Sequence, residues 1–396
     1  MSWKWLLPAA LAILVVAGCG PDKKPKDQKE AAARQWRQAR ATVLYGLAQD
    51  QYKNGNFEQA RTTTNDALKL AHDSVPLRLL SARLAIEQGQ LEVADRELSA
   101  ARKVDAKNAE VDYLSGVIYQ RWQKLETAYE YYHSAAEKQP AELAYIMAKS
   151  EMLVAMNREE EALKFLQEKV AYFEHSAVIR DAVGQLLVHK GQYKAAAEML
   201  RQSSILAPDD FTIREHLSLA LYLSEQWLSA SEQLARLTSN EKYAKRADLW
   251  VTLGECQMQL NNPRAARQSF EQATQLDPNM ASAWLSFGRA ALQSNDFRRA
   301  DLAARKAVSL EPDNGQAHLL IGYLRLHEGK GNEALAAFRK ASALDQQDTV
   351  SLCMVGYAME KTGRASEAVK YYAKALKIKP NDELATKLMA SIDLKD

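Results

Sequence analysis

Small residues recur along this chain at a fixed interval of 34 residues. Gly254, Gly288, Gly322 and Gly356 are spaced in this way. Two sets of alanines keep the same interval: Ala266, Ala300, Ala334 and Ala368, then Ala273, Ala307, Ala341 and Ala375. A period of this length indicates one supersecondary unit that is copied along the chain and buries its apolar face by stacking on its neighbours.

Extending this frame toward the N-terminus gives ten units over residues 41–382. Only the sixth unit breaks the step, with two extra residues near Lys245 and Arg246. The units begin at Ala41, Val75, Ala109, Leu143, Ala177, Phe211, Ala247, Ala281, Gly315 and Thr349. Because Ala and Leu dominate while Gly (16) and Pro (10) are scarce, we expect every unit to be helical.

The shared positions predict a pair of helices in each unit. Position 20 is Ala in all ten units and position 8 is Gly, Ala or Ser, which permits two helices to approach closely. Position 15 is Gly or Asn in eight units, as suits the left-handed residue that ends a helix. Position 32 is Pro in five units, where it stops the second helix. Asn279 and Asp313 follow such prolines, and we expect them to cap the next helix.

The late units resemble the tetratricopeptide repeat (TPR). The seventh carries Trp250, Leu253, Gly254, Ala266, Phe270, Ala273 and Pro278, and the eighth carries Trp284, Gly288, Ala300, Ala307 and Pro312. The resemblance implies an all-α fold, a right-handed TPR superhelix (α-solenoid) of about ten helix-turn-helix repeats. Units four and six depart from it, because Lys169 and Leu237 replace the small residue at position 27.

The first nineteen residues read as a secretory signal. Lys4 precedes the apolar run Leu6 to Val16, which is too short to span a bilayer as a helix. Val16-Ala17-Gly18-Cys19 resembles the lipobox of bacterial lipoproteins. The resemblance implies cleavage after residue 18, a lipid thioether on Cys19 and an acyl group such as palmitate on its amino group. In the enterobacterial sorting pattern, Gly20 favours a periplasm-facing position on the outer membrane over retention in the inner membrane.

Flanking segments complete the expected organisation. Residues 20–40 are expected to form a solvated tether up to Glu30 and then a basic helix, Ala31 to Arg40, that caps the array or contacts anionic lipid headgroups. Residues 383–396 are expected to form a C-terminal capping helix, in which Leu384, Leu388 and Ile392 cover the last unit.

The sequence gives no sign of a catalytic, metal-binding or disulfide site. It lacks the H-E-x-x-H, G-x-S-x-G and phosphate-loop motifs, so we expect no enzyme and no cofactor. His189 and His216 lie in neighbouring units without a further ligand at metal spacing. Cys256 and Cys353 stand three units apart, too far for a disulfide. A net charge of +2 gives no sign of nucleic-acid binding.

Binding is expected on positions 2, 5, 9 and 12 of the first helices, a stripe turned away from the core. In the TPR family this stripe lines the concave, ligand-holding face. Units one to three place there Tyr45, Tyr52, Lys53, Arg83, Tyr113 and Arg121. Units four to six place there Met147, Val154, Val178, Val188, Leu219, Tyr222 and Leu223. Units eight to ten add Arg289, Leu319, Tyr323, Cys353 and Tyr357.

Two functions fit this stripe. The Lys/Asn/Arg clamp of chaperone-binding TPR domains is absent, since no unit has Lys at position 5 or Asn at position 9. The apolar middle units instead resemble a groove for a helix or an extended peptide, unless those side chains pack inside the superhelix. The favoured reading is an envelope lipoprotein that scaffolds a protein complex, similar in plan to TPR lipoproteins of pilus secretin assembly, β-barrel assembly or exopolysaccharide export, and able to form a homo-oligomer. The alternative is a periplasmic polysaccharide-binding module that uses the Tyr and Arg residues of units one to three.

Overall fold

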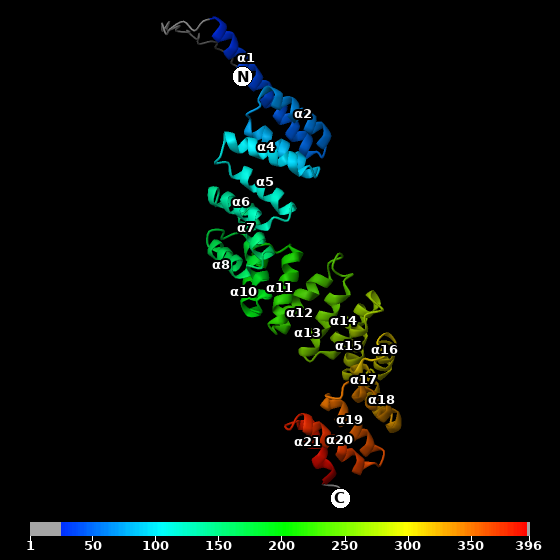
Figure 1. Cartoon of the computed structure of the whole chain (residues 1–396). Helices are drawn as coiled ribbons and strands as arrows, with labels where there is room; N and C mark the ends of the chain where they lie inside the picture. Colours follow the sequence, from blue (N-terminus) through cyan, green and yellow to red (C-terminus); the bar gives the residue numbers. More distant parts are fainter. Residues whose placement is uncertain (1–24, 394–396) are drawn as a thin grey trace, which may run out of the picture. The chain divides into compact units, whose positions relative to one another are not determined.

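The computed structural model describes residues 25–393. The expected signal segment, its lipobox and Cys19 lie outside the described residues. Within the described range the chain forms 21 α-helices and no strand (Figure 1). The predicted all-α solenoid is therefore confirmed. None of the helices in this range is both long enough and apolar enough to cross a membrane.

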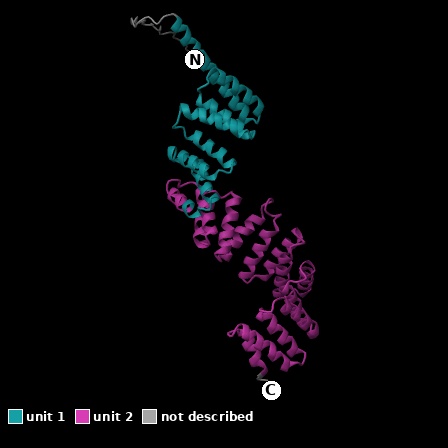
Figure 2. Ribbon diagram, in the orientation of Figure 1, with its two compact units in different colours: residues 1–162 teal, residues 163–396 magenta. Residues whose placement is uncertain are grey.

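The chain divides into two compact units, residues 1–162 and 163–396 (Figure 2). The helices up to the division are α1 (Pro25–Lys53), α2 (Phe57–Leu70), α3 (Val75–Glu87), α4 (Leu91–Val104), α5 (Ala109–Arg121), α6 (Leu125–Lys138), α7 (Leu143–Ala155) and α8 (Glu159–Val170), within which the division falls. The second unit continues with α9 (Ala177–His189), α10 (Tyr193–Leu206), α11 (Phe211–Leu223), α12 (Trp227–Thr238), α13 (Ala247–Gln259), α14 (Pro263–Leu276) and α15 (Ala281–Gln293). It ends with α16 (Phe297–Leu310), α17 (Gly315–His327), α18 (Gly331–Leu344), α19 (Thr349–Lys361), α20 (Ala365–Ile378) and α21 (Glu383–Asp393).

Caps mark where the first helices begin. The side chains of Asn108, Asp210 and Asn314 accept hydrogen bonds from backbone N–H groups of the first turns of α5, α11 and α17. The expectation for Asn279 and Asp313 is wrong, because the N-cap lies one residue later, at Met280 and Asn314. The Asn279 N–H donates instead to Oδ1 of Asp277, within the preceding turn.

The turn between the two helices of a repeat uses one left-handed residue. Position 15 has a positive φ in every repeat: Gly55, Gly89, Gln123, Asn157, Gly191, Glu225, Asn261, Asn295, Gly329 and Gly363. Gln123 (φ 59°) and Glu225 (φ 62°) adopt this conformation although neither is Gly or Asn. The turn geometry is thus imposed by the packing of the helix pair, and these two residues carry backbone strain.

Within each repeat the core is filled by a small residue facing a large one. The alanines at position 20 are fully buried in all ten repeats. A Cβ added at Gly116 would stand 2.6 Å from the ring of Tyr132, and one at Gly254 would stand 2.6 Å from the ring of Phe270. Glycine at position 8 thus makes room for a large side chain at position 24, which is aromatic in four repeats and is Leu200 opposite Gly184 in the fifth. The eighth repeat has Ala304 at position 24, and Gly288 is contacted instead by Leu320 of the next repeat.

The N-terminal end differs from the expectation. We expected a tether to Glu30 and a separate capping helix from Ala31, but α1 runs without a break from Pro25 to Lys53. Residues 26–45 contain no Gly or Pro and are rich in Ala, Arg, Gln and Lys, so nothing interrupts the helix. Residues 26–40 are all exposed, and Figure 1 shows this half of α1 extending past α2.

The C-terminal end is covered by α21, which contacts α19 and α20. Ala385 and Ile392 are buried and Leu388 packs against the last core cluster. Leu384, which we expected to take part, is 38 % exposed. Because one helix face carries residues 385, 388, 389 and 392, residue 384 falls at its edge.

Two repeats have shorter second helices. The helices α8 and α12 have 12 residues each and end at Val170 and Thr238, whereas the other second helices have 14 residues. Both end directly after the large residue that departs from the repeat pattern at position 27, Lys169 or Leu237. The extra residues at Lys245 and Arg246 lie in the turn that follows α12.

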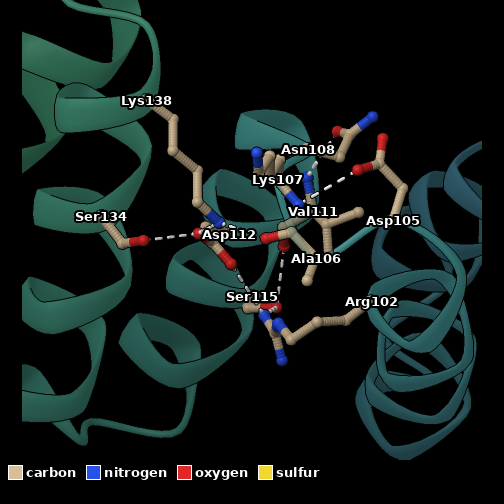
Figure 3. Close-up of polar contacts among 10 residues, drawn as sticks. All are labelled: Arg102, Asp105, Ala106, Lys107, Asn108, Val111, Asp112, Ser115, Ser134 and Lys138. Atoms are coloured by element: carbon tan, nitrogen blue, oxygen red, sulfur yellow. Dashed lines mark hydrogen bonds and ion pairs between the residues drawn. The ribbon is translucent and has the colours of Figure 1, made fainter.

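A buried carboxylate joins three helices of the first unit (Figure 3). Asp112 on α5 is 4 % exposed. Its Oδ1 accepts from Nη2 of Arg102 at the end of α4 at 3.1 Å. Its Oδ2 accepts from Nζ of Lys138 at 2.5 Å and from Oγ of Ser134 at 2.6 Å, both on α6. Two cations and a hydroxyl satisfy this carboxylate, so it fixes α4 and α6 against α5.

Candidate partner-binding surfaces

The first unit gathers four of the expected residues, Lys53 among them, at one cavity. Tyr45, Tyr52 and Arg83 line a cavity of about 580 Å³ together with Gln49 and Glu110. These residues come from the stripe positions of three successive first helices, α1, α3 and α5. We call this cavity the tyrosine cavity.

Several of its polar groups are already paired. Nη2 of Arg83 lies 2.6 Å from Oε1 of Glu110. The hydroxyl of Tyr45 accepts from Nε2 of Gln49 at 2.7 Å. Burial raises the pKa of Tyr45 and of Tyr52. The phenols therefore stay neutral, and the charge of Arg83 is balanced within the cavity.

Tyr113 and Arg121 take other positions. The ring of Tyr113 packs on the ring of Tyr145, with 4.9 Å between centroids, and on that of Tyr132 at 5.6 Å. Nη1 of Arg121 donates to the carbonyl oxygen of Ile86 at 2.6 Å. Arg121 thereby holds the end of α3. Met147 and Val154 lie half-buried on α7.

The second unit exposes part of the apolar stripe. Leu219 on α11 is 46 % exposed and Val178 on α9 is 50 % exposed. Val188, Tyr222 and Leu223 are half-buried. Internal packing therefore hides part of the stripe and leaves Leu219 and Val178 open to solvent.

Tyr222 lies at the wall of a cavity of about 430 Å³ whose lining includes Trp227, Glu255 and Met258. Its O–H donates to Oε2 of Glu255 at 2.6 Å, and its ring meets that of Trp227 edge-on at 5.5 Å. The hydrogen bond to Glu255, with burial, raises the pKa of Tyr222 to about 12. The phenol is thus a neutral donor fixed across two repeats.

A second cavity of about 370 Å³ adjoins the first and includes Leu292, Tyr323 and Val350 in its lining. Arg289 and Gln293 on α15 line both cavities. Burial, followed by the charge of Asp348, raises the pKa of Tyr323. We call the two adjoining cavities the Arg289 groove. Arg289 is exposed, and no ion pair or hydrogen bond of its side chain is formed within residues 25–393.

One stripe residue, Cys353, is not available to a ligand in the expected way. Cys353 is fully buried in the core of the last repeats, whereas Leu319, which is 4 % exposed in the same cluster, lines the second cavity of the Arg289 groove. On α19 of the tenth repeat, Ser351 to Gly356 are all buried. The expected stripe did not include the seventh repeat. Its positions 9 and 12 are Glu255 and Met258, which line the Arg289 groove, so the repeat frame itself could have found them.

His216, Cys256 and Cys353 are paired or buried. Nδ1 of His216 lies 2.8 Å from Oδ1 of Asp181, and this contact raises the pKa of His216. Within residues 25–393 no three His, Cys, Asp or Glu side chains are grouped to hold a metal ion. Cys256 and Cys353 are free thiols whose pKa burial raises to about 12.

Comparison with known proteins adds a family match for the last part of the chain. The family described as the cilia and flagella-associated protein 70 C-terminal domain, a TPR domain, matches residues 237–395. This match falls on repeats that already show the 34-residue period and the paired helices. The repeats are tetratricopeptide repeats. The chain is accordingly a TPR-type scaffold for protein–protein interaction.

A curated relative and two solved structures align with parts of this TPR chain. The BBSome complex member BBS4 of Bos taurus is 23% identical over 222 residues, which are 56% of this chain and 42% of BBS4. The chain thus spans less than half the length of that relative. One crystal structure of MamA aligns at 21% identity with a TM-score of 0.39, covering 41% of this chain and 95% of MamA. Another aligns at 20% identity with a TM-score of 0.33, covering 52% and 92%.

Proposed function

We propose that this TPR chain is a lipid-anchored scaffold of the bacterial cell envelope, which holds a segment of a protein partner in the Arg289 groove. The observation that carries the binding site is the junction of two cavities at Arg289 and Gln293. Successive first helices supply the walls, so the groove runs across the repeats. A helix or an extended peptide fits such a groove.

The chemistry of the groove describes the segment that it takes. Trp227, Met258 and Leu292 offer apolar and aromatic contact area, which suits a large apolar side chain of the partner. Arg289 has no anionic partner within the described chain, and its guanidinium can form two parallel hydrogen bonds with a carboxylate. The partner segment therefore carries an acidic residue close to its apolar anchor.

The envelope location is supported by the sequence of residues 1–19 and by nothing in the relatives, whose names refer to cilia and to the BBSome. A lipid on Cys19 would place the TPR array facing the periplasm, with Gly20 favouring the outer membrane. Membrane flotation of wild-type protein and of Cys19→Ser tests this location. Wild-type protein found free in the soluble fraction would contradict the anchor, and flotation with the inner membrane would contradict the sorting.

The binding site is tested by Leu219→Asp combined with Tyr222→Ala. Tyr222 lines the Arg289 groove and Leu219 is exposed on the same helix. We expect partner capture from envelope extract to fall about thirtyfold, with little change in melting temperature. Unchanged capture would move the site elsewhere. A large drop in melting temperature would show that these residues belong to the core.

A second candidate function is favoured by the tyrosine cavity. Tyr45 and Tyr52 present aromatic surface beside the amides and carboxylate of Gln49, Asn108 and Glu110, a combination that suits the faces and hydroxyls of sugar rings. A periplasmic polysaccharide would then bind the first unit. Tyr52→Ala should weaken binding of a cell-surface polysaccharide fraction while Tyr222→Ala leaves it unchanged. Equal binding by both variants would remove this candidate.

A further inference from the structure

One face of each first helix serves to stack a repeat on the repeat before it. In the third repeat, Val111 and Ile118 on α5 share a core cluster with Ala94, Leu98 and Ala101 of α4. Ser115, between them on the same face, accepts a hydrogen bond from Arg102 of α4. These residues stand at positions 3, 7 and 10 of the repeat. A first helix thus presents positions 3, 7 and 10 to the preceding second helix.

The same positions are buried in the other repeats whose preceding second helix lies in the same compact unit of the chain. The residues at position 3 are Leu77, Tyr145, Ile213, Leu249, Ala283, Ala317 and Ser351, all buried. The residues at position 10 are Leu84, Met152, Ala220, Cys256, Ala290, Leu324 and Ala358, also all buried. This face is therefore built to be covered by a helix.

The first repeat keeps the face but leaves it open. Its positions 3, 7 and 10 are Val43, Leu47 and Asp50. Val43 is 72 % exposed and Leu47 is 49 % exposed. Trp36, which lies about two helical turns before Val43 on the same face of α1, is 56 % exposed. The Arg40 guanidinium lies 5.2 Å from the centroid of its ring. Because α1 continues straight from Pro25 to Lys53, its first half does not fold back over this face.

The two ends of the array are thus unlike. At the C-terminal end α21 covers the last helix pair. Head-to-tail stacking of copies would require that end to be open. The open face of α1 is therefore suited to the same face of another copy, which gives a closed two-fold contact.

We propose that the α1 stripe of Trp36, Arg40, Val43, Leu47 and Asp50 is a self-association surface, on which α1 of a second copy packs antiparallel. The charges of the stripe set the register. Residues 40 and 50 are equally distant from residue 45, so an antiparallel pair centred there places Arg40 opposite Asp50 of the second copy. The same register places Val43 opposite Leu47.

The contact is self-complementary in charge and in the placement of its apolar residues. Neither Arg40 nor Asp50 has an ion-pair partner within the described chain, so each is available to the other copy. The two-fold axis makes every pairing twice, giving two ion pairs that flank four aliphatic side chains. Trp36 reaches the turn near Asn54 of the second copy, where Phe57 is exposed.

Two differently tagged full-length chains, coexpressed and extracted in mild detergent, test this surface. One tag is captured and the copurified fraction of the other is measured. Leu47→Asp in both chains should lower the copurified fraction at least about tenfold, because two charges enter the apolar centre. The matched control Val178→Asp changes an equally exposed aliphatic residue on α9 and should leave the fraction unchanged.

A charge swap tests the register. Arg40→Asp alone and Asp50→Arg alone should each lower the copurified fraction, because like charges then face each other. The double variant Arg40→Asp/Asp50→Arg should restore it. No copurification of the wild-type chain, or an unchanged fraction with Leu47→Asp, overturns the proposal. If the double variant copurifies as little as the single variants, the antiparallel register is wrong. The proposal that a second copy covers the α1 stripe is then overturned with it. Groove variants such as Arg289→Glu should not alter this result, so the test is independent of the proposed partner site.

Discussion

Gly254 on α13 lies directly under the ring of Phe270 on α14, so close that a Cβ on Gly254 would stand 2.6 Å from Cε1 of the ring. The same relationship joins Gly116 to Tyr132 and Gly356 to Tyr372. Where position 8 is Ala, as at Ala82, position 24 is the smaller Leu98 in the same core cluster. In these repeats the size of the residue at position 8 is therefore matched by that of its neighbour across the helix pair.

The first prediction concerns this match. Gly254→Ala should lower the free energy of unfolding by about 1–3 kcal/mol, because the added methyl group forces the Phe270 ring out of its position. Thermal melting followed by circular dichroism measures the loss. Combining it with Phe270→Leu should recover part of the stability, since Ala82 with Leu98 already forms such a pair.

A matched glycine provides the control. A Cβ at Gly46, also within a helix, would have no atom within 4 Å. Gly46→Ala should therefore stabilise the chain by about 0.5–1 kcal/mol, because the unfolded chain loses conformational freedom. If both glycines respond alike to alanine, the close approach of Phe270 is not what matters.

The second prediction concerns strain in the turns. Glu225 has φ 62° although it bears a side chain. Glu225→Gly should raise the stability by about 1 kcal/mol, because glycine adopts this conformation without steric cost. Gly191, at the same position one repeat earlier, has φ 71°, so Gly191→Ala should do the opposite. A lower melting temperature for Glu225→Gly would contradict the strain.

The third prediction ranks the members of the Asp112 cluster. The Asp112 side chain is 6% exposed, whereas those of Arg102 and Lys138 are 31% and 28% exposed. Lys138→Met leaves Asp112 paired with Arg102 and Ser134 and should cost about 1 kcal/mol. Asp112→Ala leaves two cations side by side and should cost about 2–3 kcal/mol. Chemical denaturation of the two variants checks the order, and the reverse order would show that Lys138 contributes more than the carboxylate.

The fourth prediction concerns pH. The hydrogen bond and charge of Asp181 raise the pKa of His216 in the folded chain, with smaller contributions from Glu215 and Asp210. Stability from a raised pKa is fully present below the unfolded value of about 6.5 and is lost as the pH rises through the folded value. Asp181→Asn should therefore lower the melting temperature more at about pH 5.5 than at about pH 8.5. An equal effect at both pH values would show that His216 is not charged when it pairs.

The repeat frame predicted the helix pairs because each shared residue has a local cause, such as Ala266 between two helices or Gly329 in a turn. The continuous α1 was not predicted, since a sequence without breakers does not tell where a tether gives way to a helix. Nor could the spacing show the burial of Leu319 and Cys353, because this depends on how neighbouring repeats rotate. The Arg289 groove lay partly outside the expected residues, because the expected stripe left out the seventh repeat with Glu255 and because Trp227 lies on a second helix, at the turn that follows Tyr222.

The most direct test of the Arg289 groove as the partner site is photo-crosslinking in living cells. A photoreactive residue replaces Gln293 in the groove or Leu302, an exposed apolar residue on the second helix α16. We predict a discrete protein adduct from position 293 that disappears when Arg289→Glu is added, and none from position 302. An adduct at 302 but not at 293, or an adduct at 293 that survives Arg289→Glu unchanged, would contradict the account.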